Sequence, residues 1–503
     1  MVQRNIKLNP KTFQISGLVL GLFLALLVYI FAPAVATGID GDVHALSQNG
    51  RIILMMMTIM AVWWVLEVVP IYVTALLPLL ILPITGAQSF AHTAVSYGHS
   101  IIFLALGGFV LAAALEKWNI HKKFANGVLS LVGNDPKRLI GGFMFAAAVL
   151  SMWISNTAAA IIMLPIALSV IHADDKAPSV IDADDKDSGH SKNFAPCLLL
   201  AICYSCSMGG MTTLIGTTTN MFFAGYMETV LGHEISFTRW MLFSGPVALI
   251  MLFLIWWLLT YVLLPVKMVS SREDQRVSYL QEPIPWTRDS IVTLCVFLLV
   301  ALSWICMPLI NKIPGLQHLT MYIVAILGVV LLFSIPAASQ PQGLLDWKTA
   351  CEKIPWGVLL LIGGGLSLAK AFSNFGVSEY LALQVSGISV FPLIFIFLTI
   401  ISLMVFLTEV TSNVASVTAL TPVFAAMAFS LNIDSTVIVA SITLAASCAF
   451  MLPVATPPNA VIFGSERIAM TQMVRTGFVL NIVGITVITL WCYFFGAAIL
   501  LDA

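Results

Sequence analysis

The sequence SNTAAAIIMLP (Ser155–Pro165) returns 257 residues later as SNVASVTALTP (Ser412–Pro422). Each copy interrupts an apolar segment, at about 138–172 and 391–431, that would otherwise suit a membrane. Small polar groups at membrane depth are costly unless they line a cavity or bind a ligand. The pair therefore predicts two re-entrant hairpins whose tips carry the polar residues and face a shared cavity.

The amino-acid composition is typical of a membrane protein. Of its 503 residues, 59% are apolar and 9% are charged, whereas a soluble domain carries about 25% charged residues. We therefore predict an all-α polytopic membrane protein in a lipid bilayer. The net charge of −1 predicts no nucleic-acid partner. Most of the eight cysteines lie in apolar runs, among them the pair Cys203 and Cys206 within a predicted helix, and they are expected to be buried apolar residues. No enzyme motif or cofactor is expected.

Apolar runs predict about eleven transmembrane helices besides the two hairpins. The first run is expected to be an uncleaved helix, although Ala34-Val35-Ala36 resembles a signal-peptidase site. The runs lie near 15–35, 52–69, 71–86, 100–116, 194–230, 238–266, 289–310, 318–335, 355–373, 434–464 and 474–500.

Two further features obey the repeat. GTTTN (Gly216–Asn220) and ATPPN (Ala455–Asn459) break two apolar runs and lie 239 residues apart. The glycine-rich segments Ile101–Ile120 and Val358–Val377 align at 257 residues, and the polar insertion Asp174–Lys192 accounts for the difference between the two offsets. Each half thus contains a glycine-rich helix, a charged linker, a Ser-Asn hairpin and a broken helix, in that order.

Lysine and arginine predict the orientation. They gather near the N-terminus, in 117–138 and in 267–288, and such segments face the cytoplasm. Counting spans from a cytoplasmic N-terminus places the bases of the two hairpins on opposite sides of the membrane. Inverted repeats with broken helices are typical of secondary transporters.

The breaks in the helices suit charged ligands. Helix N-termini present free N–H groups to a carboxylate, while helix C-termini and unwound carbonyls suit sodium. Neither hairpin motif contains arginine, so dipoles, bound cations or a lysine elsewhere would neutralise an anion. Polar residues can also join helices together, but four clusters in a repeat favour a binding site. The side chains expected to bind a carboxylate are Asn156, Thr157, Thr217, Ser412, Asn413 and Thr456.

Four further polar residues have open roles. Glu67 is either a functional carboxylate or a carboxylate at the interface or in an ion pair. Glu409 either belongs to the site or caps or pairs with a neighbouring residue. Lys370, in the second glycine-rich helix, is expected to reach the interface or form an ion pair. His99 is either structural or a pH sensor.

Together these motifs resemble the divalent-anion:sodium symporter (DASS) family, the INDY-type di- and tricarboxylate transporters. The resemblance covers nearly the whole chain. It rests on WWVLEVVP (Trp63–Pro70), VTALLP (Val73–Pro78), ALGGFVLAAALEKWNIHKK (Ala105–Lys123), GGGLSLAKA (Gly363–Ala371), MLPVATPPN (Met451–Asn459), GTTTN and the two Ser-Asn motifs.

The resemblance implies a homodimer in the plasma membrane, with scaffold and transport domains that move as an elevator. Its domains would be N-terminal scaffold helices (1–99), a first inverted repeat (100–237), scaffold helices with a cytoplasmic linker (238–354) and a second repeat (355–503). It also implies a dicarboxylate bound by Asn156, Thr157, Thr217, Ser412, Asn413, Val414, Thr456 and Pro457. One sodium would lie near Ser151, Ser155, Asn156 and Gly216, and another near Thr408, Thr411, Asn413 and Ala455.

The chain departs from the family pattern at two places. Thr218-Thr219 replace a usual proline, which bears on the backbone around the first cation site, and Val414 replaces a frequent threonine. Citrate-type exchangers would carry a cationic residue where this chain has Ala158-Ala159-Ala160. We therefore predict sodium-coupled import of C4 dicarboxylates such as succinate, malate and fumarate. The alternatives are a sodium-independent dicarboxylate or 2-oxoglutarate exchanger and, from other classes, a channel or an enzyme.

Overall fold

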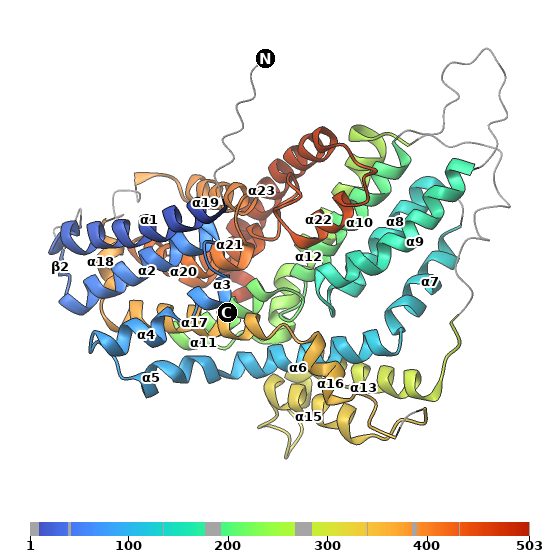
Figure 1. The fold of residues 1–503 in the computed structure, drawn as a ribbon, viewed down its shortest axis with the longest axis horizontal. Helices are drawn as coiled ribbons and strands as arrows, with labels where there is room; N and C mark the ends of the chain where they lie inside the picture. Colours follow the sequence, from blue (N-terminus) through green and yellow to red (C-terminus); the bar gives the residue numbers. More distant parts are fainter. Residues whose placement is uncertain are drawn as a thin grey trace, which may run out of the picture.

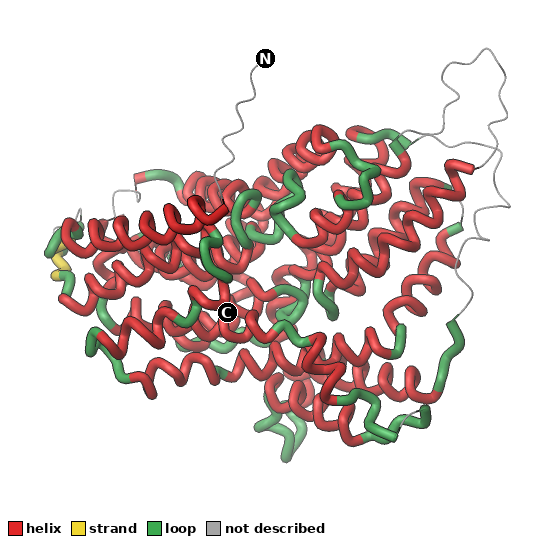
Figure 2. The backbone as a smooth tube through the Cα atoms, in the orientation of Figure 1, coloured by secondary structure: helices red, strands yellow, loops and turns green. Residues whose placement is uncertain are grey.

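The computed structural model describes residues 10–38, 42–133, 135–176, 193–266, 284–339, 341–384, 390–431 and 433–501. Most of the predicted insertion, most of the basic linker and the first nine residues lie outside the described residues. In the described part helices are the main regular structure, and the strands form one antiparallel pair, β1 (Val35–Thr37) and β2 (Val43–Ala45) (Figures 1 and 2).

The protein is a multi-pass membrane protein. Nine helices of the described part are long and apolar enough to cross a membrane. Eight of the nine correspond to predicted runs outside the hairpins, and the ninth, Asn413–Ser430, belongs to the second predicted hairpin. The sequence predicted about eleven spans besides the hairpins, and the runs near 71–86, 318–335 and 434–464 are the other three. In the structure these runs contain only shorter apolar helices, of which Met321–Ser334 and Ser435–Ala445 are two.

The N-terminal helices form one layer at the edge of the molecule. Helix α1 (Pro10–Phe31) packs along α2 (Gln48–Leu66), and the β1–β2 hairpin joins them (Figure 1). Ser47 begins α2, where its hydroxyl accepts a hydrogen bond from the N–H of Gly50 at 3.0 Å. Short elements then lead to the first glycine-rich helix: α3 (Ile71–Thr74), α4 (Leu77–Ile84), α5 (Phe90–Ala94) and η1 (Val95–Gly98).

The two halves contain equivalent helices. Helices α8 (Pro136–Ser151) and α19 (Leu393–Thr408) have the same length and lie 257 residues apart at both ends. Helices α9 (Asn156–Lys176) and α20 (Asn413–Ser430) begin at the same offset. The equivalent helices that precede them are α6 (Ser100–Lys117) with α17 (Trp356–Asn374) and α7 (Ile120–Val132) with α18 (Val377–Gln384).

The broken helices and the helices after them are also equivalent. Helix α10 (Phe194–Met211) stops before α11 (Thr218–Val230), as α21 (Ser435–Ala445) stops before α22 (Pro457–Phe463). Helix α12 (Phe237–Trp257), continued by η2 (Leu258–Leu263), corresponds to α23 (Met470–Leu500). Between the halves lie α13 (Arg288–Ile305), α14 (Met307–Ile310), α15 (Met321–Ser334) and α16 (Trp347–Lys353).

The two halves interlock around the breaks. Helix α22 of the second half packs against α9 and α10, and α11 of the first half packs against α20 and α21. The glycine-rich helices allow close packing: a Cβ on Gly107 would lie 2.7 Å from the Cβ of Ala325 on α15, and one on Gly364 would meet the carbonyl of Ala75. This interlocking brings the four irregular segments to one place.

Candidate functional site

Both hairpin tips and both helix breaks line one cavity of about 850 Å³. Four helices begin at its wall, namely α9, α11, α20 and α22. Residues far apart in the sequence therefore share one chamber. The predicted site residues that line it are Ser155, Asn156, Thr157, Gly216, Thr217, Thr411, Ser412, Asn413, Val414, Ala455, Thr456 and Pro457.

Two predicted sodium residues, Ser151 and Thr408, are buried but are not among the lining residues. The Ser151 hydroxyl donates to Oδ1 of Asn156 at 2.6 Å, so it touches the site through that side chain. The Thr408 hydroxyl instead donates to the carbonyls of Met404 and Val405, both at 3.0 Å. The two equivalent positions thus differ in how they face the hairpin tips.

Threonine begins the second helix of each break. Thr217 has φ −135° and ψ 150°, and Thr456 has φ −141° and ψ 148°. Their hydroxyls accept from the N–H groups of Asn220 at 3.4 Å and Asn459 at 3.3 Å. The caps of α11 and α22 thus have the same geometry, although the first helical residue is Thr218 in α11 and Pro457 in α22. The absence of proline from the first break does not change the backbone there.

Each break is also held by an asparagine amide. Nδ2 of Asn220 donates to the carbonyls of Gly210, Met211 and Thr213 at 3.3, 3.1 and 2.7 Å. These carbonyls lie where the helix unwinds, and burial without a partner would be costly for them. Asn220 belongs to the motif GTTTN, but the sequence spacing did not predict what its side chain does.

Two residues that line the cavity have buried polar atoms without a hydrogen-bond partner in the described part of the chain. Among the described residues, Oδ1 of Asn413 and the hydroxyl of Ser207 are buried and have no hydrogen-bond partner, and both residues line the cavity. Buried polar groups in folded proteins are nearly always paired. Sequence reasoning missed Ser207, because it lies within α10 and outside the recurring motifs.

Charged side chains line the cavity where it meets solvent. Lys353 is half exposed and pairs with Glu116 at 2.8 Å, at the C-terminal end of α6. Glu67 ends α2 with a left-handed backbone (φ 46°), is exposed, and forms no ion pair with any residue that the structure describes. Lys353 is the lining lysine that the sequence reasoning missed, whereas Lys370 on α17 does not line the cavity.

A second ion pair lies beside this rim. Nζ of Lys117 contacts the Asp346 carboxylate at 2.9 Å, and Asp346 caps α16 by accepting from the N–H of Thr349, also at 2.9 Å. These hydrogen bonds, first those from Thr349 and then that from Lys117, hold the pKa of Asp346 well below its usual range. Lys117, the first residue of the basic segment 117–138, thus lies next to the lining residue Glu116 at the C-terminal end of α6.

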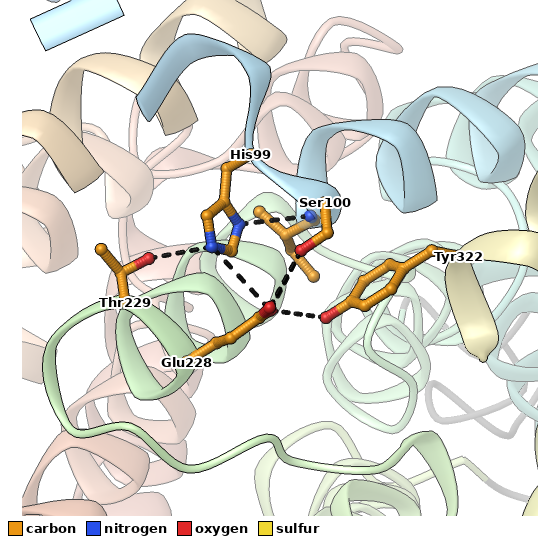
Figure 3. A network of polar contacts seen from close by, with 6 residues as sticks. His99, Ser100, Glu228, Thr229 and Tyr322 are labelled. Carbon is orange, nitrogen blue, oxygen red and sulfur yellow. Dashed lines mark hydrogen bonds and ion pairs between the residues drawn. The ribbon is translucent and has the colours of Figure 1, made fainter. Parts of the chain in front are cut away.

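At the other end of α6, a polar network joins three helices (Figure 3). The Glu228 carboxylate of α11 accepts from the Tyr322 hydroxyl of α15 at 2.6 Å and from the Ser100 hydroxyl at 3.1 Å. Nδ1 of His99 accepts from the N–H of Ile101, which leaves the proton of a neutral ring on Nε2, 3.1 Å from the Thr229 hydroxyl. His99 therefore has a structural contact in this network.

The described residues contain no group of three His, Cys, Asp or Glu side chains that could hold a metal ion. The polar residues that line the cavity at the hairpin tips and breaks, such as Ser155, Asn156 and Thr217, instead offer amide, hydroxyl and backbone carbonyl oxygens. Such neutral oxygens suit an alkali cation better than a transition metal.

Comparison with known proteins places the chain in a family. It is 37% identical over 495 residues to the sodium-dependent dicarboxylate transporter SdcS of Staphylococcus saprophyticus, covering 96% of this chain and 91% of that protein. SdcS of Staphylococcus aureus is 36% identical over 488 residues, with the same coverage of both chains.

Solved structures share the fold. The YdaH transporter of Alcanivorax borkumensis and the MtrF efflux pump of Neisseria gonorrhoeae each match with a TM-score of 0.61 at 12% identity. The match covers 98% of this chain in both cases, with 100% of the YdaH chain and 97% of the MtrF chain. The family model "Sodium:sulfate symporter transmembrane region" matches residues 18–501. The chain is a transporter of the sodium:sulfate symporter family.

Proposed function

We propose that this protein imports C4 dicarboxylates such as succinate, malate and fumarate together with sodium. The observation that carries the proposal is one cavity lined by equivalent segments of both halves. Its lining residue Asn413 has a buried Oδ1 without a partner among the described residues. The relatives named as sodium-dependent dicarboxylate transporters support this substrate class.

The substrate carboxylates would lie at the N-termini of α9, α11 and α20, where N–H groups and helix dipoles favour negative charge. Amides and hydroxyls then orient the anion. Val414 contributes an apolar contact where Thr157 of the first half has a hydroxyl. The substrate residues we propose are Asn156, Thr157, Thr217, Ser412, Asn413, Val414, Thr456 and Pro457.

Two sodium ions would bind behind the hairpin tips. Hydroxyls, an asparagine amide and an unwound carbonyl are the available oxygens in each half. Their charge would offset that of the dicarboxylate, since neither hairpin motif contains arginine. We propose Ser151, Ser155, Asn156 and Gly216 for the first ion, and Thr408, Thr411, Asn413 and Ala455 for the second.

The transport cycle we propose is an elevator in a plasma-membrane homodimer. The pairs α8–α9 and α19–α20 would be hairpins that re-enter from opposite faces, within inverted repeats at 100–237 and 355–503. Helices of 1–99 and 238–354 would form most of the scaffold, with the N-terminus in the cytoplasm. Because the lining residues Glu116 and Lys353 pair directly before the basic segment 117–138, the conformation described here would be open to the cytoplasm.

Uptake of radiolabelled succinate into proteoliposomes tests the proposal. We expect an inward sodium gradient to drive accumulation, and malate and fumarate to compete. Uptake that does not depend on sodium and requires preloaded internal dicarboxylate would reject the symporter and indicate an exchanger. Uptake that neither saturates nor shows countertransport would instead indicate a channel.

A further inference from the structure

Glu409 is a buried carboxylate placed between the second hairpin and the second helix break. It directly follows α19, and 3% of its surface is exposed. Oε1 accepts from the N–H groups of Phe450 and Met451 at 2.8 and 2.9 Å. Oε2 accepts from the N–H of Leu452 at 3.0 Å. Three consecutive backbone N–H groups of the unwound segment after α21 therefore converge on one side chain.

A fourth donor comes from another helix. Nδ2 of Asn481, on α23, donates to Oε1 of Glu409 at 2.6 Å, and Oδ1 of Asn481 accepts from the N–H of Phe450 at 3.3 Å. The Tyr204 hydroxyl of α10 holds the carbonyl of Phe450 at 2.9 Å. The unwound segment is thus fixed from α10, α19 and α23, and Glu409 contributes the largest number of bonds.

The first half builds the same junction without a charge. The residue 257 positions before Glu409 is Met152, whose backbone carbonyl accepts from the Thr213 hydroxyl at 2.6 Å. Thr213 lies 239 positions before Leu452. The contact of Met152 with Thr213 in the first half is therefore equivalent to the contact of Glu409 with Leu452 in the second half. Only the second junction contains a carboxylate.

The charge of Glu409 has no cationic partner in the described part of the chain. All the contacts named above are N–H donors, an arrangement that an ionised carboxylate satisfies and a protonated one would not. None of the ion pairs among the described residues includes Glu409. A buried charge without a counter-charge is costly, and a cation bound close to it would lower that cost.

We infer that Glu409 is a positioning residue that raises the sodium affinity of the second half of the site. Its carboxylate holds the backbone that leads to Ala455 and Thr456, and its charge attracts the cation proposed beside Thr408 and Thr411. The two sodium sites are then unequal, because the first half has a methionine in the equivalent place. This inference rests on the proposed sodium-coupled function.

Sodium titration of succinate uptake by Glu409→Gln tests the inference. The glutamine keeps the shape but turns one acceptor oxygen into an N–H donor that faces other donors, and it removes the charge. We expect the sodium concentration for half-maximal uptake to rise at least tenfold. At saturating sodium, the succinate KM should return to within about threefold of the wild-type value. Glu379→Gln, an exposed carboxylate on α18, is the matched control and should titrate like the wild type.

The outcomes separate a positioning role from a structural one. A folded Glu409→Gln protein with a sodium half-saturation within twofold of the wild type overturns the inference, even if its melting temperature has fallen. If this variant does not fold, Asn481→Ala is measured instead. A rise of threefold or more in the sodium concentration for half-maximal uptake supports the inference, and a smaller rise rejects it. Sodium-independent uptake by the wild type would reject the proposed function instead.

Discussion

The side-chain amides of Asn220 and Asn459 hold the two broken helices by equivalent hydrogen bonds. Nδ2 of Asn220 donates to the carbonyls of Gly210 and Thr213, and Nδ2 of Asn459 donates to those of Ala449 and Leu452. Donors and acceptors are all 239 residues apart. The same local solution therefore fixes both breaks, although only one of them contains proline.

Asn220→Asp and Asn459→Asp should each destabilise the protein by about 3 kcal/mol and abolish uptake. The aspartate removes the N–H donors and places oxygen against buried carbonyls that then lack partners. Thermal unfolding in detergent and succinate uptake measure both effects. Asn374→Asp, at the exposed end of α17, is the control. A wild-type melting temperature in either break variant would refute the role of the amides.

Gly210→Ala should abolish uptake, because its Cβ would meet Oδ1 of Asn156 and the Thr217 side chain, both at the site. Gly127→Ala is the matched control, since nothing lies within 4 Å of its added Cβ. In that helix the change should raise stability by up to about 1 kcal/mol and leave transport intact. Initial uptake rates of the two variants decide the matter, and similar rates would count against the close contact at Gly210.

Tyr322→Phe should shift the protein away from the conformation described here. The change removes the 2.6 Å hydrogen bond to Glu228, worth about 1.5–3 kcal/mol for a charged acceptor, and so loosens α11 from α15. Distances between spin labels on α9 and α15 should broaden or lengthen in the variant. Tyr493→Phe on α23, which is exposed, should leave them unchanged. If both variants match the wild type, the network of Figure 3 does not hold this state.

Asp346→Asn should lower the free energy of unfolding by about 1 kcal/mol through a weaker helix cap and a lost ion pair. Because the folded-state pKa of Asp346 lies below its usual value, its stabilisation is present above about pH 4 and is lost as the pH falls through the folded pKa. The difference in stability from the wild type should therefore stay constant between about pH 8 and pH 5. A difference that changes sign or disappears within that range would contradict the assignment.

The repeat was predictable from the sequence because it is a property of spacing. The offset of 257 placed the starts of α9 and α20 at Asn156 and Asn413, where the structure has them. The same spacing predicted that distant motifs would share a site, and twelve of the proposed residues line one cavity. Apolar runs were less informative about helix length, since the run near 318–335 contains a helix of only 14 residues, Met321–Ser334.

The partners of the remaining polar residues could not be predicted, because they depend on how helices pack. Glu409 contacts backbone N–H groups, which no side-chain pattern reveals. Glu228, Tyr322 and His99 meet only because α6, α11 and α15 converge. The proline missing from the first break was expected to matter for its backbone, yet Thr217 and Thr456 have nearly the same φ and ψ.

The central claim is that both halves share one binding site. Isothermal titration calorimetry of succinate binding in sodium tests it on three purified proteins: the wild type, Asn156→Ala and Asn413→Ala. We predict one succinate per chain for the wild type. Each single variant should remain folded and lose all binding, because each half supplies part of the same site. Two succinates per chain in the wild type, with about half of the sites retained in each variant, would contradict the account.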